Sequence, residues 1–335
     1  MNIPHSAPWI SADDISSVSA VLARGMLANG VLVQEFEAEC QRYLQLDRAW
    51  ATTSGQAALV RALLALGVGS EGEVVMPTYV CQSVADAVRA IGARPVYCDV
   101  GEDWCINAAS VSSVLSSKTV AIVAVHAFGV FADVQALLQF GVPVIEDCCQ
   151  CFSPQVGAIG AVAIYSLHAT KCLTGAEGGL IATAHPEIAK AITNSYERTP
   201  ESGRFSDLQA ALALSQLRRY PEMLHRRALL ANTYFESLPP EATKRLSRVK
   251  NRCMFFRFPL SLASGFDAFS ENFQIYGVTT RRGVDQLLHR QQTTDDRNFP
   301  VAAELYRTTL SLPLYPSLQQ TDLNHILEVA TKVLA

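Results

Sequence analysis

Three groups of residues have the types and positions needed to hold an anionic cofactor that carries a carbonyl group. Lys171 offers an amine that can form a Schiff base, and it follows the apolar run Val162–Tyr165. Asp147 offers a carboxylate shortly after the apolar run Val142–Ile145. Ser54-Gly55-Gln56 begins a helical pattern, and the free N–H groups at a helix start suit a phosphate. Each group alone also has an ordinary structural explanation, as a surface charge or a helix cap.

Together the three groups match the needs of pyridoxal 5'-phosphate (PLP). This cofactor requires a lysine for its imine, a carboxylate at its pyridine nitrogen and an anion site for its phosphate. The carboxylate keeps the ring nitrogen protonated, so that the ring can accept electrons from a substrate carbanion. The sequence therefore predicts that Lys171 holds PLP and that Asp147 pairs with the ring.

The elements that must position these residues indicate an α/β fold. Short runs rich in Val and Ile alternate with helical patterns, which predicts a mostly parallel central sheet covered by helices. The predicted strands are Ala49–Thr52, Glu73–Met76, Pro95–Cys98, Val120–Val125, Val142–Ile145, Val162–Tyr165 and Leu180–Ala182. The predicted helices between them are Ala57–Leu66, Ser83–Ile91, Ala108–Leu115 and Val134–Phe140. Ligands of such sheets bind beyond the carboxyl ends of the strands, where the three groups fall.

The remainder of the chain predicts a smaller C-terminal α+β domain. Its elements, and those leading into it, are a helical stretch from Ser206 to about Leu238 interrupted at Pro221, a strand Cys253–Phe258, a strand-like Ile275–Thr280 and a closing helix Asp322–Leu334. The pair Pro239-Pro240 breaks the chain between the helical stretch and the rest. We expect a large PLP-binding domain over residues 1–235 and a small domain over residues 236–335.

Several motifs in this order resemble a known family. The most specific are Ile145-Glu146-Asp147-Cys148-Cys149-Gln150 and Tyr165-Ser166-Leu167-His168-Ala169-Thr170-Lys171, with Glu177-Gly178-Gly179 after them. Further matches are Gly30–Glu37, Ser54–Leu59, Gly92–Val96, Val125–Gly129, Leu208–Ala211 and Leu312–Leu318. Over nearly its whole length the chain is similar to the DegT/DnrJ/StrS-type (sugar) aminotransferases, which have PLP fold type I, the aspartate-aminotransferase-like fold.

The resemblance implies a role for each matching residue. Lys171 would be the Schiff-base lysine, and Asp147 would pair with the pyridinium nitrogen. Gln150 would approach the ring and its 3-oxygen. The phosphate would be held by Ser166 and by the backbone at Gly55 and Gln56.

The family also implies a homodimer whose active sites lie at the subunit interface. A loop of the neighbouring subunit would reach the cofactor through Ser202, where the family has Asn. This chain departs from the family pattern at two other positions. Gln56 stands where the family usually has Thr or Ser, and Cys81 stands where an aromatic residue usually stacks on the ring.

Other residues have competing explanations. Gly67–Gly72 matches a dinucleotide fingerprint, but it follows a helix and precedes a strand, so a helix-to-strand turn is the better interpretation. Cys148, Cys149 and Cys151 lack a second Cys or His pair at zinc spacing, so we expect small buried side chains and no metal. His168 either lines the site or makes a structural hydrogen bond. Arg281-Arg282 either meet an anionic substrate or form a solvated pair.

Composition restricts the partners and the compartment. A formal net charge of -4 argues against nucleic acid as a partner, because phosphate backbones require a basic face. The chain has no run of 18 apolar residues, so no membrane span is expected. Its start has no signal-peptide pattern, and nine cysteines suit free thiols in a reducing cytoplasm better than a disulfide framework.

The resulting hypothesis is a ping-pong aminotransferase of nucleotide-sugar biosynthesis. An amino acid, glutamate in this interpretation, would donate its amino group, and a nucleotide-linked keto-sugar would accept it. Two alternatives remain: a PLP enzyme of the same fold with another outcome, such as a dehydratase, and a non-catalytic relative that binds sugar nucleotides. Dehydratases of the family commonly replace the lysine by His, and a non-catalytic relative should have lost Lys171 or Asp147, so both alternatives are disfavoured.

Overall fold

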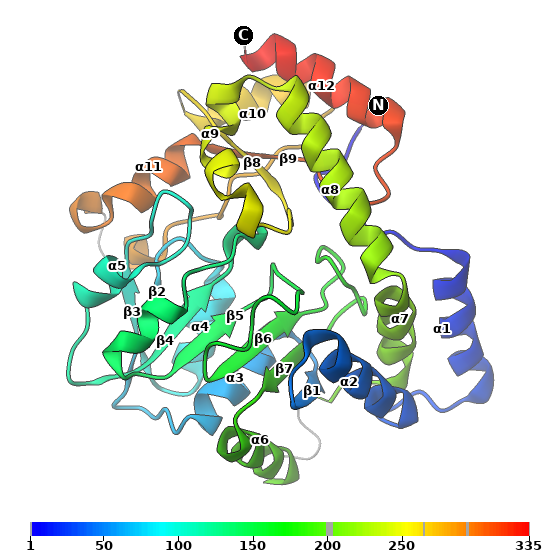
Figure 1. Ribbon diagram of the computed structural model, residues 1–335, viewed down its shortest axis with the longest axis vertical. Coiled ribbons are helices and arrows are strands. Elements are labelled where there is room, and N and C mark those ends of the chain that lie inside the picture. Colours follow the sequence, from blue (N-terminus) through cyan, green and yellow to red (C-terminus); the bar gives the residue numbers. More distant parts are fainter. Residues whose placement is uncertain (1, 199–203, 264, 293–294, 335) are drawn as a thin grey trace.

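A seven-stranded, mostly parallel sheet forms the centre of the molecule (Figure 1). The computed structural model describes residues 2–198, 204–263, 265–292 and 295–334. The strands are β1 (Arg48–Thr52), β2 (Glu73–Pro77), β3 (Arg94–Cys98), β4 (Thr119–Val125), β5 (Val144–Asp147), β6 (Val162–Ser166) and β7 (Gly179–Thr183). Their order in the sheet is β1-β7-β6-β5-β4-β2-β3, and only β7 runs antiparallel to its neighbours.

Helices cover both faces of this sheet. On one face lie α3 (Gly55–Ala65), α4 (Gln82–Ala90) and α6 (Pro186–Arg198), whereas α2 (Val31–Leu44) and α7 (Asp207–Arg218) cover the other face near β1. A further helix, α1 (Ala12–Arg24), packs against α7. Because both faces are covered, every residue of β2 and β7 is buried, and this explains the apolar runs Val74–Met76 and Leu180–Ala182 within them.

The C-terminal part forms a second group of elements above the sheet in Figure 1. Its helices and strands are α8 (Tyr220–Ser237), α9 (Pro240–Val249), β8 (Phe258–Ser261), α10 (Phe266–Ile275), α11 (Pro300–Thr308), β9 (Thr309–Leu312) and α12 (Gln320–Leu334). The remaining short helical elements of the described chain are α5 (Ala108–Ser112), η1 (Ala127–Gly129), η2 (Gln135–Phe140), η3 (Lys250–Arg252), η4 (Leu288–Gln291) and η5 (Asp296–Asn298). Strands β8 and β9 form a separate antiparallel pair.

The two groups of elements share apolar packing. One buried cluster extends from Val75 and Ile122 of the central sheet to Leu230 of α8 and Leu312 of β9. The N-terminal segment also contacts the C-terminal part, because Ile3 forms an isolated β-bridge with Val278. Helix α8 runs through residue 235 without a break, so the division into domains at that position stays a prediction.

Most of the expected elements are confirmed. All seven predicted strands of the sheet are present, with ends displaced by two residues or fewer. The helical stretch does break next to Pro221, since α7 ends at Arg218 and α8 begins at Tyr220. Gly67–Gly72 forms the turn between α3 and β2, as the rejection of the dinucleotide fingerprint required.

Two predicted strands and one helix are wrong. Instead of a strand over Cys253–Phe258, the structure has an isolated bridge at Cys253, and β8 begins at Phe258. Helix α10 occupies the start of the strand-like Ile275–Thr280. The helix expected over Val134–Phe140 is the 3-10 helix η2. Short apolar runs do not reveal their pairing partners, and pairing decides whether such a run becomes a strand.

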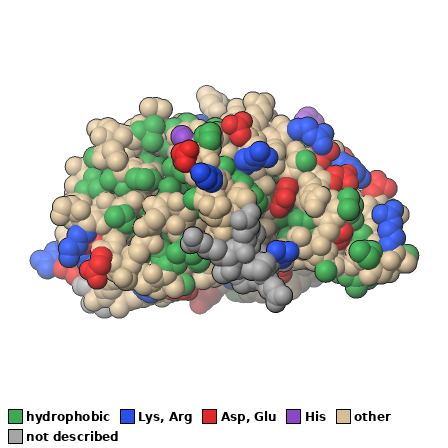
Figure 2. Space-filling view, turned by 90° about the horizontal axis from the view of Figure 1, so that it is seen from below, with side chains coloured by type: hydrophobic (Ala, Val, Ile, Leu, Met, Phe, Trp, Pro, Cys, Tyr) green, Lys and Arg blue, Asp and Glu red, His purple; other side chains and the backbone are tan. Residues whose placement is uncertain are grey.

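The described residues include no membrane-spanning helix, and the face shown in Figure 2 carries charges of both signs. Among the residues that the structure describes, no helix combines the length and apolar character needed to cross a membrane. On the face shown in Figure 2, acidic and basic side chains are interspersed with apolar ones.

Candidate active site

A cavity of about 330 Å³ lies where β5 and β6 end and α3 begins. It brings together the cofactor-binding residues that the sequence predicted within the described chain, namely Gly55, Gln56, Cys81, Asp147, Gln150, Ser166 and Lys171. Ser202, expected from a partner subunit, lies outside the described residues. The cavity is at the carboxyl edge of the parallel strands, where α/β sheets bind their ligands.

The start of α3 presents unused hydrogen-bond donors to this cavity. Ser54 caps the helix, and its Oγ accepts the N–H of Ala57 at 3.0 Å. The N–H groups of Gly55 and Gln56 have no acceptor among the described residues. Ser166, at the end of β6, lines the same region and can donate its hydroxyl hydrogen. Two backbone donors, a hydroxyl and the positive end of a helix dipole have the chemistry that suits a phosphate-sized anion.

Close packing favours glycine at the first position of this helix. A Cβ atom on Gly55 would lie 2.9 Å from Cys149 Sγ and 3.2 Å from Ser166 Cβ, so these side chains would have to shift. Gly179 has a similar constraint, since its Cβ would lie 2.4 Å from the backbone of Ser54. The missing side chains allow the ends of β6 and β7 to approach the anion site.

Asp147 is the last residue of β5 and borders the cavity from a buried position. Its Oδ1 accepts the N–H of Cys149 at 3.0 Å, which orients the carboxylate. Burial and the charge of Asp147 raise the pKa of the Cys149 thiol well above its usual value. The thiol therefore stays neutral, and Asp147 supplies the negative charge at this end of the cavity.

Glu146 points to the opposite face of the strand and belongs to a structural network. Its two oxygens accept N–H groups of the segment 157–160 at 2.6–2.8 Å, and Oε2 also lies 3.1 Å from His126 Nε2. Burial alone would raise the pKa of Glu146, but His126 and these backbone donors lower it below its usual value. The adjacent acids thus have different positions because successive side chains of a strand alternate between its faces.

The network around Glu146 includes residue types that can bind a metal ion. His126, Glu146 and Cys148 are buried, and their ligand atoms lie within 4.8 Å of one another. However, His126 Nδ1 accepts the N–H of Ala132 at 3.0 Å, so Nε2 carries the hydrogen that points to Glu146. Both imidazole nitrogens and both carboxylate oxygens are therefore used within the protein.

Gln150 presents an amide donor to the cavity. Its Oε1 accepts the N–H of Phe128 at 2.7 Å, which leaves the NH₂ group for an oxygen acceptor. Phe128 has a left-handed conformation with φ 57°, and Gly129 follows with φ 86°. A Cβ on Gly129 would lie 2.9 Å from the Phe256 nitrogen, so close backbone packing holds this turn.

Lys171 lies in a turn after β6, with its amine at the cavity. Its Nζ is 5.3 Å from the centroid of the Phe256 ring, and it forms no ion pair within the described part of the chain. His168 supports this turn: its Nδ1 accepts the N–H of Thr170 at 3.2 Å, and its carbonyl accepts the N–H of Lys171 at 2.9 Å. His168 Nε2 faces Glu177 at 3.5 Å, which favours the structural interpretation of this histidine although it also lines the cavity.

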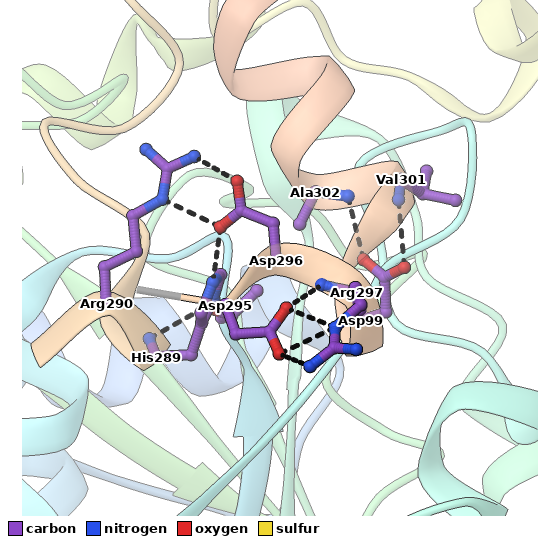
Figure 3. Close-up of polar contacts among 9 residues, drawn as sticks. Asp99, His289, Arg290, Asp295, Asp296, Arg297, Val301 and Ala302 are labelled. Atoms are coloured by element: carbon purple, nitrogen blue, oxygen red, sulfur yellow. Dashed lines mark hydrogen bonds and ion pairs between the residues drawn. The ribbon is translucent and has the colours of Figure 1, made fainter. Parts of the chain in front are cut away.

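The loop that ends in Cys81 is anchored from the C-terminal part. The His289 ring is buried, its Nδ1 lies 2.7 Å from Thr78 Oγ1, and its Nε2 lies 2.9 Å from Asp296 (Figure 3). Asp99, just after β3, accepts the N–H groups at the start of α11 in the same view. Cys81 itself is exposed at the start of α4. Contacts between distant segments therefore set the loop that borders the cavity.

Sequence reasoning missed Phe256 and Arg257: Lys171 Nζ and Arg257 Cζ each lie 5.3 Å from the centroid of the Phe256 ring. The available signal was a charged residue inside the apolar run Met254–Phe258. Of the expected pair Arg281-Arg282, Arg282 binds Asp267 at 2.5 Å and also lies over Phe266 and Tyr306, so its role is structural.

Comparisons with known proteins agree on one family. The family model described as "DegT/DnrJ/EryC1/StrS aminotransferase family" matches residues 8–331. The spore coat polysaccharide biosynthesis protein SpsC of Bacillus subtilis (strain 168) is 29% identical, over 99% of this chain and 97% of SpsC. The aminotransferase TlmJ of Streptoalloteichus hindustanus is 25% identical with a TM-score of 0.89, over 100% of this chain and 99% of TlmJ. DesI, solved in the presence of its TDP-sugar product, is 22% identical with a TM-score of 0.88, over 98% of this chain and 91% of DesI.

Proposed function

Because the chain belongs to the DegT/DnrJ/EryC1/StrS aminotransferase family and is a PLP-dependent sugar aminotransferase, we propose that it moves an amino group from glutamate to a nucleotide-linked keto-sugar. The observation that carries the proposal is the shared cavity of Lys171, Asp147 and the free N–H groups of Gly55 and Gln56. DesI, with its TDP-sugar product, supports a nucleotide-linked acceptor.

The residues of the cavity fit PLP. The donors of Gly55, Gln56 and Ser166 suit its phosphate, and the cavity volume of about 330 Å³ suits a small aromatic cofactor. Asp147 would hold a proton on the ring nitrogen, and the free amide hydrogens of Gln150 would bind the ring oxygen. When bound, PLP supplies an electron sink that stabilises negative charge on the substrate carbon.

Lys171 would serve twice in the reaction. Its Nζ is the attachment point of the cofactor, and after the donor amine has displaced it, the same Nζ would remove the proton from the donor Cα. Proton transfer requires a neutral amine. The absence of an ion pair to Lys171 in the described chain suits that requirement, because a neighbouring carboxylate would stabilise the charged form.

The test of the donor half-reaction uses the purified holoenzyme. We expect visible absorption that disappears on titration with L-glutamate, and borohydride reduction should fix the cofactor on Lys171, as read by peptide mass spectrometry. Lys171→Ala should lose turnover by several orders of magnitude, since attachment and proton transfer fail together. A label on another lysine would refute the site assignment.

The acceptor is tested separately with the amine-loaded enzyme. A nucleotide-linked keto-sugar should restore the original spectrum, and the same keto-sugar without its nucleotide should do so at least about tenfold less efficiently, since the nucleotide adds binding contacts. Equal efficiency for both compounds would contradict a nucleotide-linked acceptor.

We also infer a homodimer in which the segment containing Ser202 enters the neighbouring site, because this segment precedes α7 in the sequence, where the family resemblance implies such a contact. A fully active monomer in sedimentation experiments would contradict this inference. A cytoplasmic location is supported by the nine cysteines, all of which have free thiols.

A further inference from the structure

The Phe256 ring lies beside the amine of Lys171. Lys171 Nζ is 5.3 Å from the ring centroid, within the range of an attractive contact between a cation and an aromatic face. Phe256 is buried and belongs to the C-terminal part, whereas Lys171 follows β6 of the central sheet. Among the described residues the Lys171 amine forms no ion pair, so this ring is a candidate partner for its charge.

Two hydrogen bonds hold the backbone of Phe256 in place. Its N–H donates to the carbonyl of Phe128 at 3.0 Å, and its own carbonyl accepts a hydrogen bond from Arg227 Nη1 at 3.1 Å. Arg227 comes from α8, is buried and also donates to the Leu314 carbonyl at 3.0 Å. A buried guanidinium depends on such bonds because they replace its contacts with water. The position of the ring is therefore set by segments that are far apart in the sequence.

The same backbone contact connects Phe256 to Gln150. Phe128 donates its N–H to Gln150 Oε1 at 2.7 Å and accepts the N–H of Phe256 through its carbonyl. Phe128 and Phe255 both have left-handed backbones, with φ 57° and φ 54°, a conformation that is unfavourable for residues with a side chain and persists only where the surroundings impose it. Two strained residues therefore lie at the contact that places the Gln150 amide at the cavity and the Phe256 ring at Lys171.

An aromatic face suits an amine that must gain and lose a proton. A carboxylate at this position would hold the amine in its charged form, and the amine could not accept the donor proton. A ring attracts an ammonium more weakly than a carboxylate does, and it neither gives nor takes a proton. Arg257 Cζ lies at the same 5.3 Å from the ring centroid, and repulsion between the two cations weakens the attraction further. The ring can therefore place the charge without trapping it.

We propose that Phe256 is a positioning residue that holds the Lys171 ammonium over its ring while the proton taken from the amino donor is on Nζ. The inference rests on the proposed function, in which Nζ removes that proton. The proton leaves the donor Cα for Nζ, the electron pair of the C–H bond stays on the carbon, and the proton leaves Nζ again in the next transfer. Without the ring, the ammonium would turn toward water, where its proton exchanges with solvent.

The first test measures where Lys171 lies. The chain has six lysines, so lysine labelled with ¹³C at Cε gives few NMR signals, and the signal that is absent from Lys171→Arg belongs to Lys171. In wild-type protein loaded with pyridoxamine 5'-phosphate, the hydrogens on this carbon should be shifted upfield by the ring current of Phe256. Phe256→Leu should abolish the shift, and Phe256→Tyr should keep it. A wild-type Lys171 signal without an upfield shift would overturn the inference, even if Phe256→Leu does not fold.

The second test follows the donor half-reaction with L-glutamate in D₂O. Phe256→Leu keeps an apolar side chain without an aromatic face, and its half-reaction should slow about 3- to 30-fold, the range that a cation–π contact supplies. Deuterium incorporated at the donor Cα per keto acid formed should rise at least about threefold, because the proton is lost to solvent more often. Phe256→Tyr should recover most of the wild-type rate. The dissociation constant for glutamate should stay within about threefold in both variants, because the ring contacts Lys171 and not the donor.

Phe255→Leu is the matched control. Phe255 is the neighbouring ring, but it packs against Phe235 with the ring centroids 5.9 Å apart. Its loss should change the rate and the deuterium incorporation by less than about twofold, because no cation–π contact is removed. Equal losses in Phe255→Leu and Phe256→Leu would show a general packing effect and would overturn the inference, as would an unchanged rate and unchanged deuterium incorporation in folded Phe256→Leu.

The two tests separate this inference from the proposed function. A wild type whose Lys171 signal is shifted upfield, with the shift abolished in Phe256→Leu, would support the placement of the amine even if the protein does not react with glutamate. That lack of reaction would count against the proposed donor alone.

Discussion

Replacing Asp147 with Asn removes the negative charge at the end of β5 while it preserves the size of the side chain. Asp147 is buried, with 4% of its surface exposed, and its Oδ1 accepts the N–H of Cys149 at 3.0 Å. An Asn oxygen can accept the same hydrogen bond, so the fold should tolerate the change. The variant therefore isolates the charge that we assign to the cofactor ring nitrogen.

The size of the effect follows from the burial of this carboxylate. At an effective dielectric constant of about 20 and a separation of about 3 Å, opposite unit charges attract by about 5 kcal/mol. Asn retains a dipole, so we expect a loss of about 3 kcal/mol, which lowers the rate about a hundredfold. Donor binding should weaken far less, because the charge matters most when negative charge develops on the substrate carbon.

The assay is a stopped-flow measurement of the half-reaction with the amino donor, followed by borohydride labelling to show that the cofactor is still held on Lys171. Glu146→Gln is the matched control, since Glu146 is the neighbouring buried acid on the opposite face of the same strand. It should lower the melting temperature but leave the rate of the folded protein within about threefold. Near-normal half-reaction rates for Asp147→Asn with bound cofactor would refute the assignment.

Two further predictions concern the anion site and the pH dependence of stability. Gly55→Ala should weaken cofactor binding about tenfold or more in fluorescence titrations, because its Cβ would lie 2.9 Å from Cys149 Sγ. Adding Cys149→Ala should restore part of the affinity. If the double variant binds no better, a clash with this thiol is not the cause. Burial raises the pKa of Glu37 to about 7, so the folded protein binds this proton more tightly than the unfolded chain does. The resulting stabilisation is fully present below about pH 4.5 and is lost as the pH rises through 7. Urea denaturation should show the wild type losing about 2 kcal/mol relative to Glu37→Gln between pH 5 and 8, a value reduced from the full shift because Glu37 is partly exposed; parallel pH profiles would argue against this origin.

The sequence alone was sufficient for the sheet, for the family and for most of the residues that line the cavity. Runs rich in Val and Ile become strands wherever helices cover both faces, so β1 to β7 could be located within two residues of their observed ends. The prediction of the site then followed from the topology of the sheet. Strands that run in parallel end at one edge, and the residues after them, including Asp147 and Lys171, must meet there.

Contacts between distant segments required the tertiary structure. The different positions of Glu146 and Asp147 follow from the end of β5, which lies two residues beyond the predicted end and makes Asp147 part of the strand. The sequence showed two adjacent acids, whereas the hydrogen bonds of Glu146 to residues 157–160 and to His126 assign it to the structural network.

Arg257 illustrates the same limit in the C-terminal part. From sequence the run around it predicted a strand over Cys253–Phe258, but the structure begins β8 only at Phe258 and leaves Arg257 outside the strand, over the Phe256 ring. The sequence itself shows which residues are apolar and how they repeat along an element. Which ring or cavity a charged side chain lies near depends on packing between segments far apart in the chain, and only the tertiary structure decides that.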